Sequence, residues 1–413
     1  MSELAKRFQD VRARSGALCA SLTAEDHMLQ AMPDVSPAKW HLAHTTWFFE
    51  TFLLEPLDDY AVFHPKFRTL FNSYYQAVGP QYPRPRRGLL SRPPLSAILE
   101  YRRYVDTHIL ALIEAMSADD PRQAILTLGL HHEQQHQELL ATDIKYNLSI
   151  NPLQPAWQEA APESPPAPPP RWIRMPGGLV EVGFDADGFC FDNETPRHTV
   201  WLEPYQVRST LITNAEYREF IEDGGYDDHR LWLSDGWAWR QAHNVQAPLY
   251  WQHREADGWS EYTLYGRRPL DPNAPVTHLS AYEADAFAAW AGARLITEPE
   301  WEVAAPTAPA APIDRLAAEM MHPRAPDADA DAEGALQMFG EVWQWTRSAY
   351  LPYPGYEPLP GALGEYNGKF MCGQWVLRGS ACVTPPGHTR RTYRNFFYPH
   401  QRWQFTGIRL ARG

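Results

Sequence analysis

Apolar and polar residues follow one pattern before residue 152 and a different one after residue 171. In the first part, residues 36–54, 94–116 and 120–148 carry apolar side chains at intervals of three and four positions. That spacing buries one face of a helix. Together with the N-terminal stretch, these segments predict a four-helix bundle.

In the later part the apolar runs are short, and Gly, Pro, Asp and Asn separate them, as in GGLVEVGF, HTVWLEPYQV and QWVLRGSA. Such runs predict strands in a loop-rich α+β domain. Two helices are also marked there. One begins after Ser280 and stops at a glycine, and the other follows Thr297, which forms a capping box with Glu300.

Proline density marks the boundary between the two patterns, in PLQPAWQEAAPESPPAPPP, residues 152–170. Proline removes backbone donors and favours extended chain over packing. The prediction is therefore a helical domain at 1–151, a linker at 152–171 and an α+β domain at 172–413. Residues 304–335, rich in Ala, Pro and Asp, predict a mobile or partly ordered loop.

Charge and length narrow the class of function. The 413 residues have a formal net charge of −13, which argues against non-specific binding to nucleic acid or to an anionic membrane. No signal peptide or membrane span is visible, so a cytoplasmic protein with small-molecule substrates is expected. The chain has four cysteines without CxxC spacing, Cys19, Cys190, Cys372 and Cys382, so neither a disulfide framework nor a structural zinc site is indicated. Free thiols are expected.

Histidines carry the candidate chemistry. His132 and His136 in HHEQQH are four positions apart, so a helix projects both from one face. His41 or His44, in WHLAHTTWF, can add a third imidazole across the bundle. Three neutral imidazoles leave metal positions open, which suits iron(II) and dioxygen, although zinc, nickel or cobalt would also accept them.

A zinc hydrolase is the specific rival, because His132 to His136 also match HExxH, with Glu133 as general base. Such enzymes usually take a third ligand further along the chain. The later candidates, His198, His322 and His388, lie beyond the linker.

WHLAHTTWFFE, LFNSYYQAVGPQYPRPRRGLLSRP and HHEQQHQELLATD resemble the DinB-like bundle of the sulfoxide synthases of ergothioneine biosynthesis (EgtB type). WLSDGW, APLYW, FGEVWQWT, GALGEYNGKFMC, VLRGSA and RWQFTGIRLAR are similar to their second domain. The resemblance implies a multidomain α and α+β protein. Its expected parts are an N-terminal DinB-like four-helix bundle and a C-terminal domain of the formylglycine-generating-enzyme or C-type-lectin-like fold.

The resemblance also implies iron(II) held by His44, His132 and His136, with His41 in a structural role. The implied reaction uses dioxygen to join a cysteine-type sulfur to imidazole C2 of Nα-trimethylhistidine (hercynine), giving a sulfoxide precursor of ergothioneine. Tyr74 and Tyr75 resemble the family's tyrosine pair near the iron, where a proton donor is needed. Helix-end packing is the alternative role for these tyrosines.

Substrate residues follow from the same resemblance. Gln135 and Asn395 match the residues that hold the histidine substrate, and Arg84 and Arg87 match those that bind the carboxylate of the thiol. Alternatively, Gln135 and Asn395 are hydrogen-bonded buried amides, and the arginines form a solvated charge cluster at the surface. For the trimethylammonium group, Trp343, Trp345 and Phe396 are cation–π candidates, with packing as the alternative.

One departure concerns the thiol. Family members that use γ-glutamylcysteine carry an acidic residue two positions after the asparagine, where this chain has Phe397. A buried ammonium group without a counter-charge is costly, so free cysteine is expected. γ-Glutamylcysteine, a selenosugar and, in place of hercynine, unmethylated histidine stay open as substrates.

A second departure concerns the C-terminal domain. Cys372 and Cys382 do not reproduce the close cysteine pair of formylglycine-generating enzymes, which predicts a substrate wall without that chemistry. A DinB-like thiol transferase and a lectin-like binding module stay open as other classes of function. Assembly of identical chains is left open as well.

Overall fold

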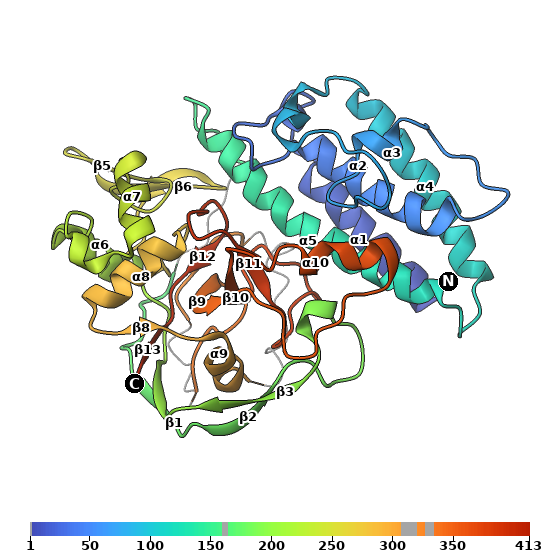
Figure 1. Ribbon diagram of the computed structural model, residues 1–413. Helices are drawn as coiled ribbons and strands as arrows, with labels where there is room; N and C mark the ends of the chain where they lie inside the picture. Colours follow the sequence, from blue (N-terminus) through green and yellow to red (C-terminus); the bar gives the residue numbers. More distant parts are fainter. Residues whose placement is uncertain (1, 159–163, 307–319, 327–333) are drawn as a thin grey trace. The chain divides into compact units, whose positions relative to one another are not determined.

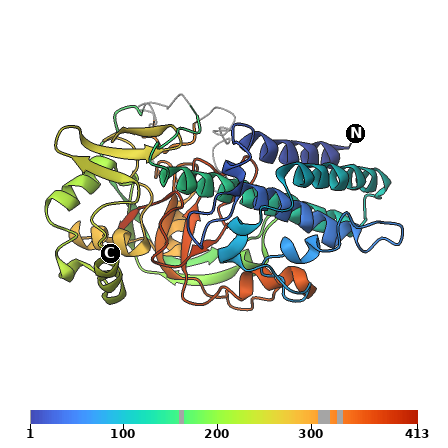
Figure 2. The ribbon, with the colours of Figure 1, turned by 90° about the horizontal axis from the view of Figure 1, so that it is seen from above.

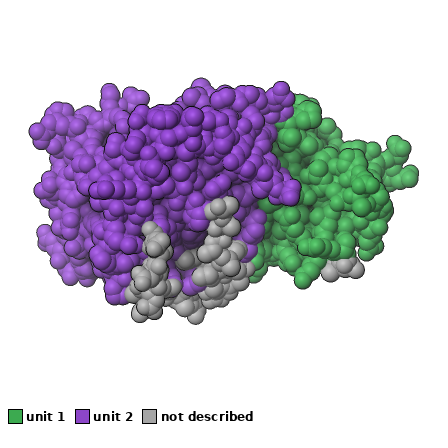
Figure 3. All heavy atoms as spheres, turned by 90° about the horizontal axis from the view of Figure 1, so that it is seen from below, with its two compact units in different colours: residues 1–153, 359–366 green, residues 154–358, 367–413 purple. Residues whose placement is uncertain are grey.

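The computed structural model describes residues 2–158, 164–306, 320–326 and 334–413. Within these ranges the chain forms two compact units, residues 1–153 with 359–366 and residues 154–358 with 367–413 (Figure 3). Residues 159–163 of the expected linker and most of the expected loop at 304–335 lie outside the described residues. Among the described residues, none of the helices has both the length and the hydropathy to cross a bilayer.

Long helices build the first unit, and the prediction of a helical N-terminal region is confirmed. The helices α1 and α2 each pack on both α4 and α5 (Figure 1), and Figure 2 shows the bundle helices lengthwise. The elements up to residue 153 are α1 Glu3–Leu18, η1 Asp26–Met28, α2 Ala38–Phe49, η2 Glu50–Leu54, α3 Phe67–Leu70, η3 Arg84–Leu89, α4 Leu95–Ala115 and α5 Arg122–Ser149.

The helices of the bundle differ in how much of their surface is buried. On α4 the buried apolar residues recur at helical spacing, as in Ile98, Val105 and Ile109, so one stripe faces the core. Every residue of α2 is buried, from Ala38 to Phe49. A helix buried on all sides lies inside the unit, so polar side chains on α2 must find partners within the protein.

Short strands dominate the second unit, and the prediction of a sheet-containing C-terminal domain is confirmed. Strand orders in the described residues are β1-β4-β13-β8, β11-β10-β9-β12, β2-β3 and β5-β6-β7. The strands are β1 Trp172–Met175, β2 Gly178–Val182, β3 His198–Leu202, β4 Tyr205–Arg208, β5 Trp251–Arg254, β6 Gly258–Thr263, β7 Gly266–Pro269, β8 Arg294–Leu295, β9 Trp343–Ala349, β10 Trp375–Gly379, β11 Asn395–Phe397, β12 Thr406–Gly407 and β13 Leu410–Arg412.

Two helices of the second half begin where the sequence predicts. The predicted capping box of Thr297 with Glu300 forms before α9, and Ser280, the predicted start of α8, forms a further capping box with Glu283. The helical elements after residue 153 are η4 Asp192–Glu194, α6 Asn214–Glu222, η5 His229–Leu231, α7 Ser234–Ala242, α8 Ala281–Trp290, α9 Glu298–Ala304, η6 Gly361–Gly364 and α10 Glu365–Gly368.

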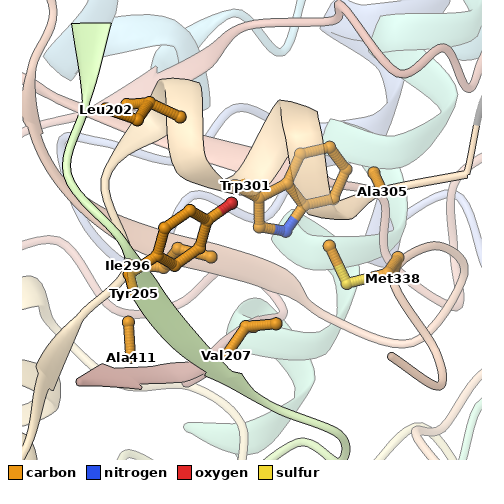
Figure 4. Close-up of a cluster of buried hydrophobic side chains, with 8 residues drawn as sticks. All are labelled: Leu202, Tyr205, Val207, Ile296, Trp301, Ala305, Met338 and Ala411. Carbon is orange, nitrogen blue, oxygen red and sulfur yellow. The ribbon is translucent and has the colours of Figure 1, made fainter. Parts of the chain in front are cut away.

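Trp301 of α9 anchors a core cluster of the second unit (Figure 4). Its ring lies among Leu202, Tyr205, Ile296 and Met338, and its indole N–H donates to Gln344 at 2.8 Å. The large buried ring and its satisfied N–H hold α9 against the strands.

Buried charges tie α9 to β10 and to the residue just before β11. Arg394 donates to both oxygens of Glu298, at 2.7 and 3.1 Å, and Arg378 donates to the same carboxylate at 3.2 Å. Burial alone would raise the pKa of Glu298, but these two guanidinium groups outweigh it and lower that pKa.

Candidate functional site

Three of the predicted residues meet in the first unit. One ligand atom from each of His44, His132 and His136 lies within 4.8 Å of the other two. His132 and His136 share a face of α5, with ring centroids 4.7 Å apart, and His44 approaches from α2. His41, the other candidate on α2, contacts His136 but lies outside this cluster.

The surroundings of His44 set its orientation. Its ring is stacked between Trp40 and Trp47, at centroid distances of 4.6 and 5.5 Å. Its Nδ1 lies 2.6 Å from the carbonyl oxygen of Phe71, so Nδ1 must carry the proton and donate. The Nε2 atom of His44 therefore keeps its lone pair for a ligand.

Burial also sets the charge of the cluster. It lowers the pKa of His132 to about 4, and burial together with neighbouring positive charge lowers the pKa of His44 and of His136 well below the ordinary histidine value. The imidazoles are therefore neutral at neutral pH, the form that binds metal.

A polar atom without a hydrogen-bond partner indicates that the cluster can accept a metal ion. Within the described residues, Nδ1 of His132 is buried and has no hydrogen-bond partner. Buried polar atoms rarely lack partners in folded proteins, and a bound ion is one explanation for those that do. An all-imidazole donor set suits iron(II) and accepts other divalent transition metals too.

Glu133, the acid of the HExxH pattern, lies in a different environment. Its carboxylate accepts from Arg12 of α1 at 2.8 Å, from Arg102 of α4 at 2.8 Å and from Ser15 at 2.6 Å. Burial alone would raise the pKa of Glu133, but the two arginines bring it down to about 2. A carboxylate held this way is a structural anion and a poor proton acceptor.

The two predicted arginines both lie in η3, and their environments differ. Arg87 is buried and donates to the hydroxyls of Ser36 and Ser73, each at 2.9 Å. Its guanidinium carbon lies 3.3 Å from the ring centroid of Trp40, and its charge contributes to the low pKa of His44. Arg87 therefore lies close to the histidine cluster.

No carboxylate in the described residues forms an ion pair with Arg87, and its Nε atom lacks a hydrogen-bond partner. Burial and the charge of Arg84 lower the pKa of Arg87 to about 9. A buried guanidinium with hydroxyl partners alone has unused capacity to bind an anion.

The tandem tyrosines separate in space. Tyr74 has a positive φ of 67°, and its hydroxyl accepts from Arg84 at 2.5 Å. Tyr75 is buried against the aromatic rings of Trp47 and Phe52, at 5.7 and 5.4 Å. The left-handed backbone at Tyr74 is uncommon for a bulky residue, and it turns the two side chains to different partners.

Sequence reasoning missed Tyr366, which belongs to the first unit through residues 359–366. Its ring lies 6.1 Å from that of Tyr74, and the neighbouring Glu365 accepts from the backbone N–H groups of Gln76 and Ala77, each at 2.7 Å. About 290 residues separate these partners, so no local spacing could have indicated the contact.

Gln135 is half-buried on α5, between the two histidines in sequence. Asn395 and Phe396 lie on β11 of the second unit, opposite Leu377 and Val376 of β10. The oxygen of the Asn395 side chain accepts from the N–H of Phe396 at 2.9 Å.

The cation–π candidates of the second unit differ in exposure. The ring of Phe396 stacks on Tyr350 at 4.1 Å and is partly accessible. Trp343 and Trp345 are 1% and 0% exposed, and the indole of Trp345 donates to Leu279. Both tryptophans therefore have the burial of core packing residues, which leaves Phe396 as the accessible candidate.

Both halves of the chain match family models. Residues 7–140 match the DinB superfamily, and residues 158–312 and 307–413 match the sulfatase-modifying factor enzyme 1-like domain. The hercynine oxygenase of Mycolicibacterium smegmatis is 33% identical over 99% of this chain and 98% of its own length. The chain belongs to the hercynine oxygenase family.

Further relatives agree with this family. A hercynine oxygenase of Mycobacterium tuberculosis is 33% identical over 92% of this chain and 91% of that protein. The formylglycine-generating enzyme of Streptomyces coelicolor is 30% identical over 56% of this chain and 86% of that protein. In this chain Cys372 is exposed and Cys382 is buried, and the two do not form a disulfide with each other.

Proposed function

We propose that this protein is an iron(II)- and oxygen-dependent sulfoxide synthase. It would join the sulfur of cysteine to imidazole C2 of Nα-trimethylhistidine and give hercynylcysteine sulfoxide. The observation that carries the proposal is the cluster of neutral imidazoles from His44, His132 and His136. Arg87, which is buried and can bind an anion, lies beside it. Near-full-length relatives named hercynine oxygenase support the choice of substrate.

The proposed reaction balances without an external reductant. One C–H bond and one S–H bond break, and one C–S bond and one S–O bond form. The second oxygen atom of O2 leaves as water, which takes up both hydrogens. Dioxygen therefore accepts the four electrons that C–S bond formation and sulfur oxidation release.

His44, His132 and His136 would hold the metal, which when bound would offer coordination positions for thiolate, imidazole and dioxygen. This chain's own residues supply orientation. Arg87 would take the carboxylate of cysteine, with Arg84 next to it, and this would fix the position of the sulfur. Gln135 and Asn395 are proposed to hold the hercynine imidazole, and Phe396 its trimethylammonium group.

A tyrosine hydroxyl would supply the proton that reduced oxygen needs. Tyr74 is the better candidate of the tandem pair, because Arg84 donates to its hydroxyl and so holds this polar group in place. Tyr75 is packed among aromatic rings, which favours a role in shaping the pocket wall.

The hydrolase alternative is less well supported by the same geometry. A zinc hydrolase of HExxH type needs Glu133 as a general base, and the two arginines that bind Glu133 keep it ionised and engaged. Its place in the ion-pair network of α1 and α4 favours a structural role.

The test is product analysis after anaerobic loading with iron(II), followed by air, Nα-trimethylhistidine and either cysteine or γ-glutamylcysteine. We expect oxygen uptake and a C–S-linked sulfoxide with cysteine. Product with γ-glutamylcysteine alone would keep the enzyme class and overturn the thiol. No oxygen uptake with either thiol would overturn the proposal.

Two neighbouring histidines provide matched variants for this test. His132→Gln should abolish product and weaken metal binding more than 10-fold, because a ligand is lost. His131→Gln should retain both, since His131 is equally buried but bonds to Arg7 and lies outside the cluster. Equal losses in both variants would contradict the assigned ligand set.

A further inference from the structure

His41 and Asp143 form a hydrogen-bonded chain that ends on one histidine of the cluster. Nε2 of His41 lies 3.0 Å from a carboxylate oxygen of Asp143, and Nδ1 of His41 lies 2.9 Å from Nδ1 of His136. The His41 and Asp143 side chains are both buried. Two nitrogens this close need one proton between them, so the chain has a definite direction.

The carboxylate sets that direction. An ionised Asp143 only accepts, so Nε2 of His41 must carry a proton and donate it. A neutral His41 then has an unprotonated Nδ1, which accepts from the Nδ1–H of His136. That leaves the proton of His136 on Nδ1 and the lone pair on Nε2.

The position of Asp143 is itself secured. The same carboxylate oxygen accepts from the backbone N–H of Ser36 at 2.8 Å, at the residue before Pro37 and the start of α2. The hydroxyl of Ser36 in turn accepts from Arg87. The chain therefore runs from His136 through His41, Asp143 and Ser36 to Arg87. Its members come from α5, α2, the residues just before α2, and η3.

We propose that His41 and Asp143 are positioning residues that hold His136 as its Nδ1–H tautomer and so direct its Nε2 to the metal. The inference rests on the proposed function for the presence of the metal, but the tautomer itself is a property of the metal-free chain. His41 would thus act through His136 without being a ligand. Partners of this kind fix the orientation of ligand histidines and increase their basicity.

The first experiment measures binding of cobalt(II), used as an oxygen-stable probe, by titration calorimetry at about pH 8, above the ordinary histidine pKa. His41→Phe should bind about 10- to 100-fold more weakly than wild type. His41→Asn should recover part of the loss, because its side-chain oxygen can accept near the position of Nδ1. Asp143→Ala should also weaken binding.

His27→Phe is the matched control for folding. His27 and His41 are each 4% exposed, but His27 bonds to the carbonyl of Thr23 and lies outside the cluster. We expect this variant to bind cobalt(II) as wild type does. Wild-type affinity in a folded His41→Phe protein, or equal losses in His41→Phe and His27→Phe, would overturn the proposal.

The second experiment needs no metal. Nitrogen NMR of metal-free protein labelled with 15N-histidine, assigned by difference from His136→Gln, reports which nitrogen of His136 carries the proton. We expect Nδ1–H in wild type and a mixture of tautomers in His41→Phe. An Nε2–H tautomer in wild type would overturn the positioning role. If wild type binds no metal yet shows Nδ1–H, the proposed function fails while the hydrogen-bonded chain stands.

Discussion

Neighbouring residues of the same type can have opposite environments, and the arginines of η3 show this most clearly. Arg86 is exposed, whereas Arg87 is buried against Trp40 with hydroxyl partners only. A buried cation without an anion is costly, so such a residue is retained where an anionic ligand can bind it. The burial of Arg87 gives the predicted substrate role a physical basis.

Replacing Arg87 tests that role at the level of one side chain. Arg87→Met should raise KM for cysteine by about 10- to 100-fold, the loss expected for a charge-assisted hydrogen bond to a carboxylate. Its kcat should change less. Arg86→Met removes the same charge from the exposed neighbour and should leave KM unchanged. The measurement is steady-state oxygen uptake with cysteine as the varied substrate, and equal effects of both changes would contradict the assignment.

Phe397 is the residue on which the choice of thiol rests. It lies on β11 opposite Trp375, and it stands where γ-glutamylcysteine users carry an acid. Phe397→Asp should gain activity with γ-glutamylcysteine by about 10-fold, because the new carboxylate can pair with the substrate ammonium group. Activity with cysteine should fall.

The matched control for Phe397 is Tyr398→Asp, which adds the same charge one position further along. Tyr398 lies beyond the end of β11 and is exposed, so this change should not improve use of γ-glutamylcysteine. Product mass spectrometry with both thiols is the measurement. An improvement in Tyr398→Asp, or none in Phe397→Asp, would contradict the subgroup argument.

At the scale of an element, α5 serves two purposes on different faces. His132 and His136 face α2 and the metal cluster, while Glu133 is turned toward α1 and α4. Successive residues on a helix point about 100° apart, so one helix can carry a site and a structural ion-pair network in adjacent positions. The histidines depend on α5 staying in place, and the Glu133 network secures it.

Glu133→Gln should therefore destabilise the bundle by about 3 kcal/mol, because it leaves two buried guanidinium groups without their anion. Urea unfolding of metal-free protein followed by far-ultraviolet circular dichroism measures this change. Glu138→Gln on the same helix, where the side chain is half-buried, should cost much less. A fully stable Glu133→Gln protein that lost only catalysis would instead favour the general-base role.

At the scale of the whole molecule, the stability of the second unit should depend on pH through a buried carboxylate, Glu298. In the second unit the folded-state pKa of Glu298 is lowered, so its contribution to stability is complete above the unfolded carboxyl pKa of about 4.3. The contribution is lost as pH falls through the lower folded-state value. Acid should therefore weaken this unit below about pH 4.

Glu298→Gln tests that prediction. The variant should be less stable than wild type by about 3 kcal/mol at neutral pH, and the difference should shrink as pH falls below about 4. Glu219→Gln, on the exposed side of α6, should follow wild type throughout. Urea midpoints measured across pH are the readout, and a difference that stays constant in acid would contradict the assigned ion pairs.

Sequence alone determined the features that depend on neighbours within one helix or strand. Helical spacing predicted the bundle and placed His132 and His136 on one face, and the Ser280 and Thr297 signals marked the starts of α8 and α9. Motif order along the chain identified the family, which the comparisons show. These features depend on local geometry, which a sequence records directly.

Only the tertiary structure decided which distant residues meet. It brought Tyr366 beside Tyr74 and paired His41 with Asp143, and it placed His44 in the cluster and His41 outside it, a choice that the family resemblance had favoured but helical spacing had left open. Spacing on α2 could not separate His41 from His44, because both can point inward from a helix that is buried on every side. Long-range packing and the satisfaction of buried polar groups settle such choices, and both arise only when separate segments come together.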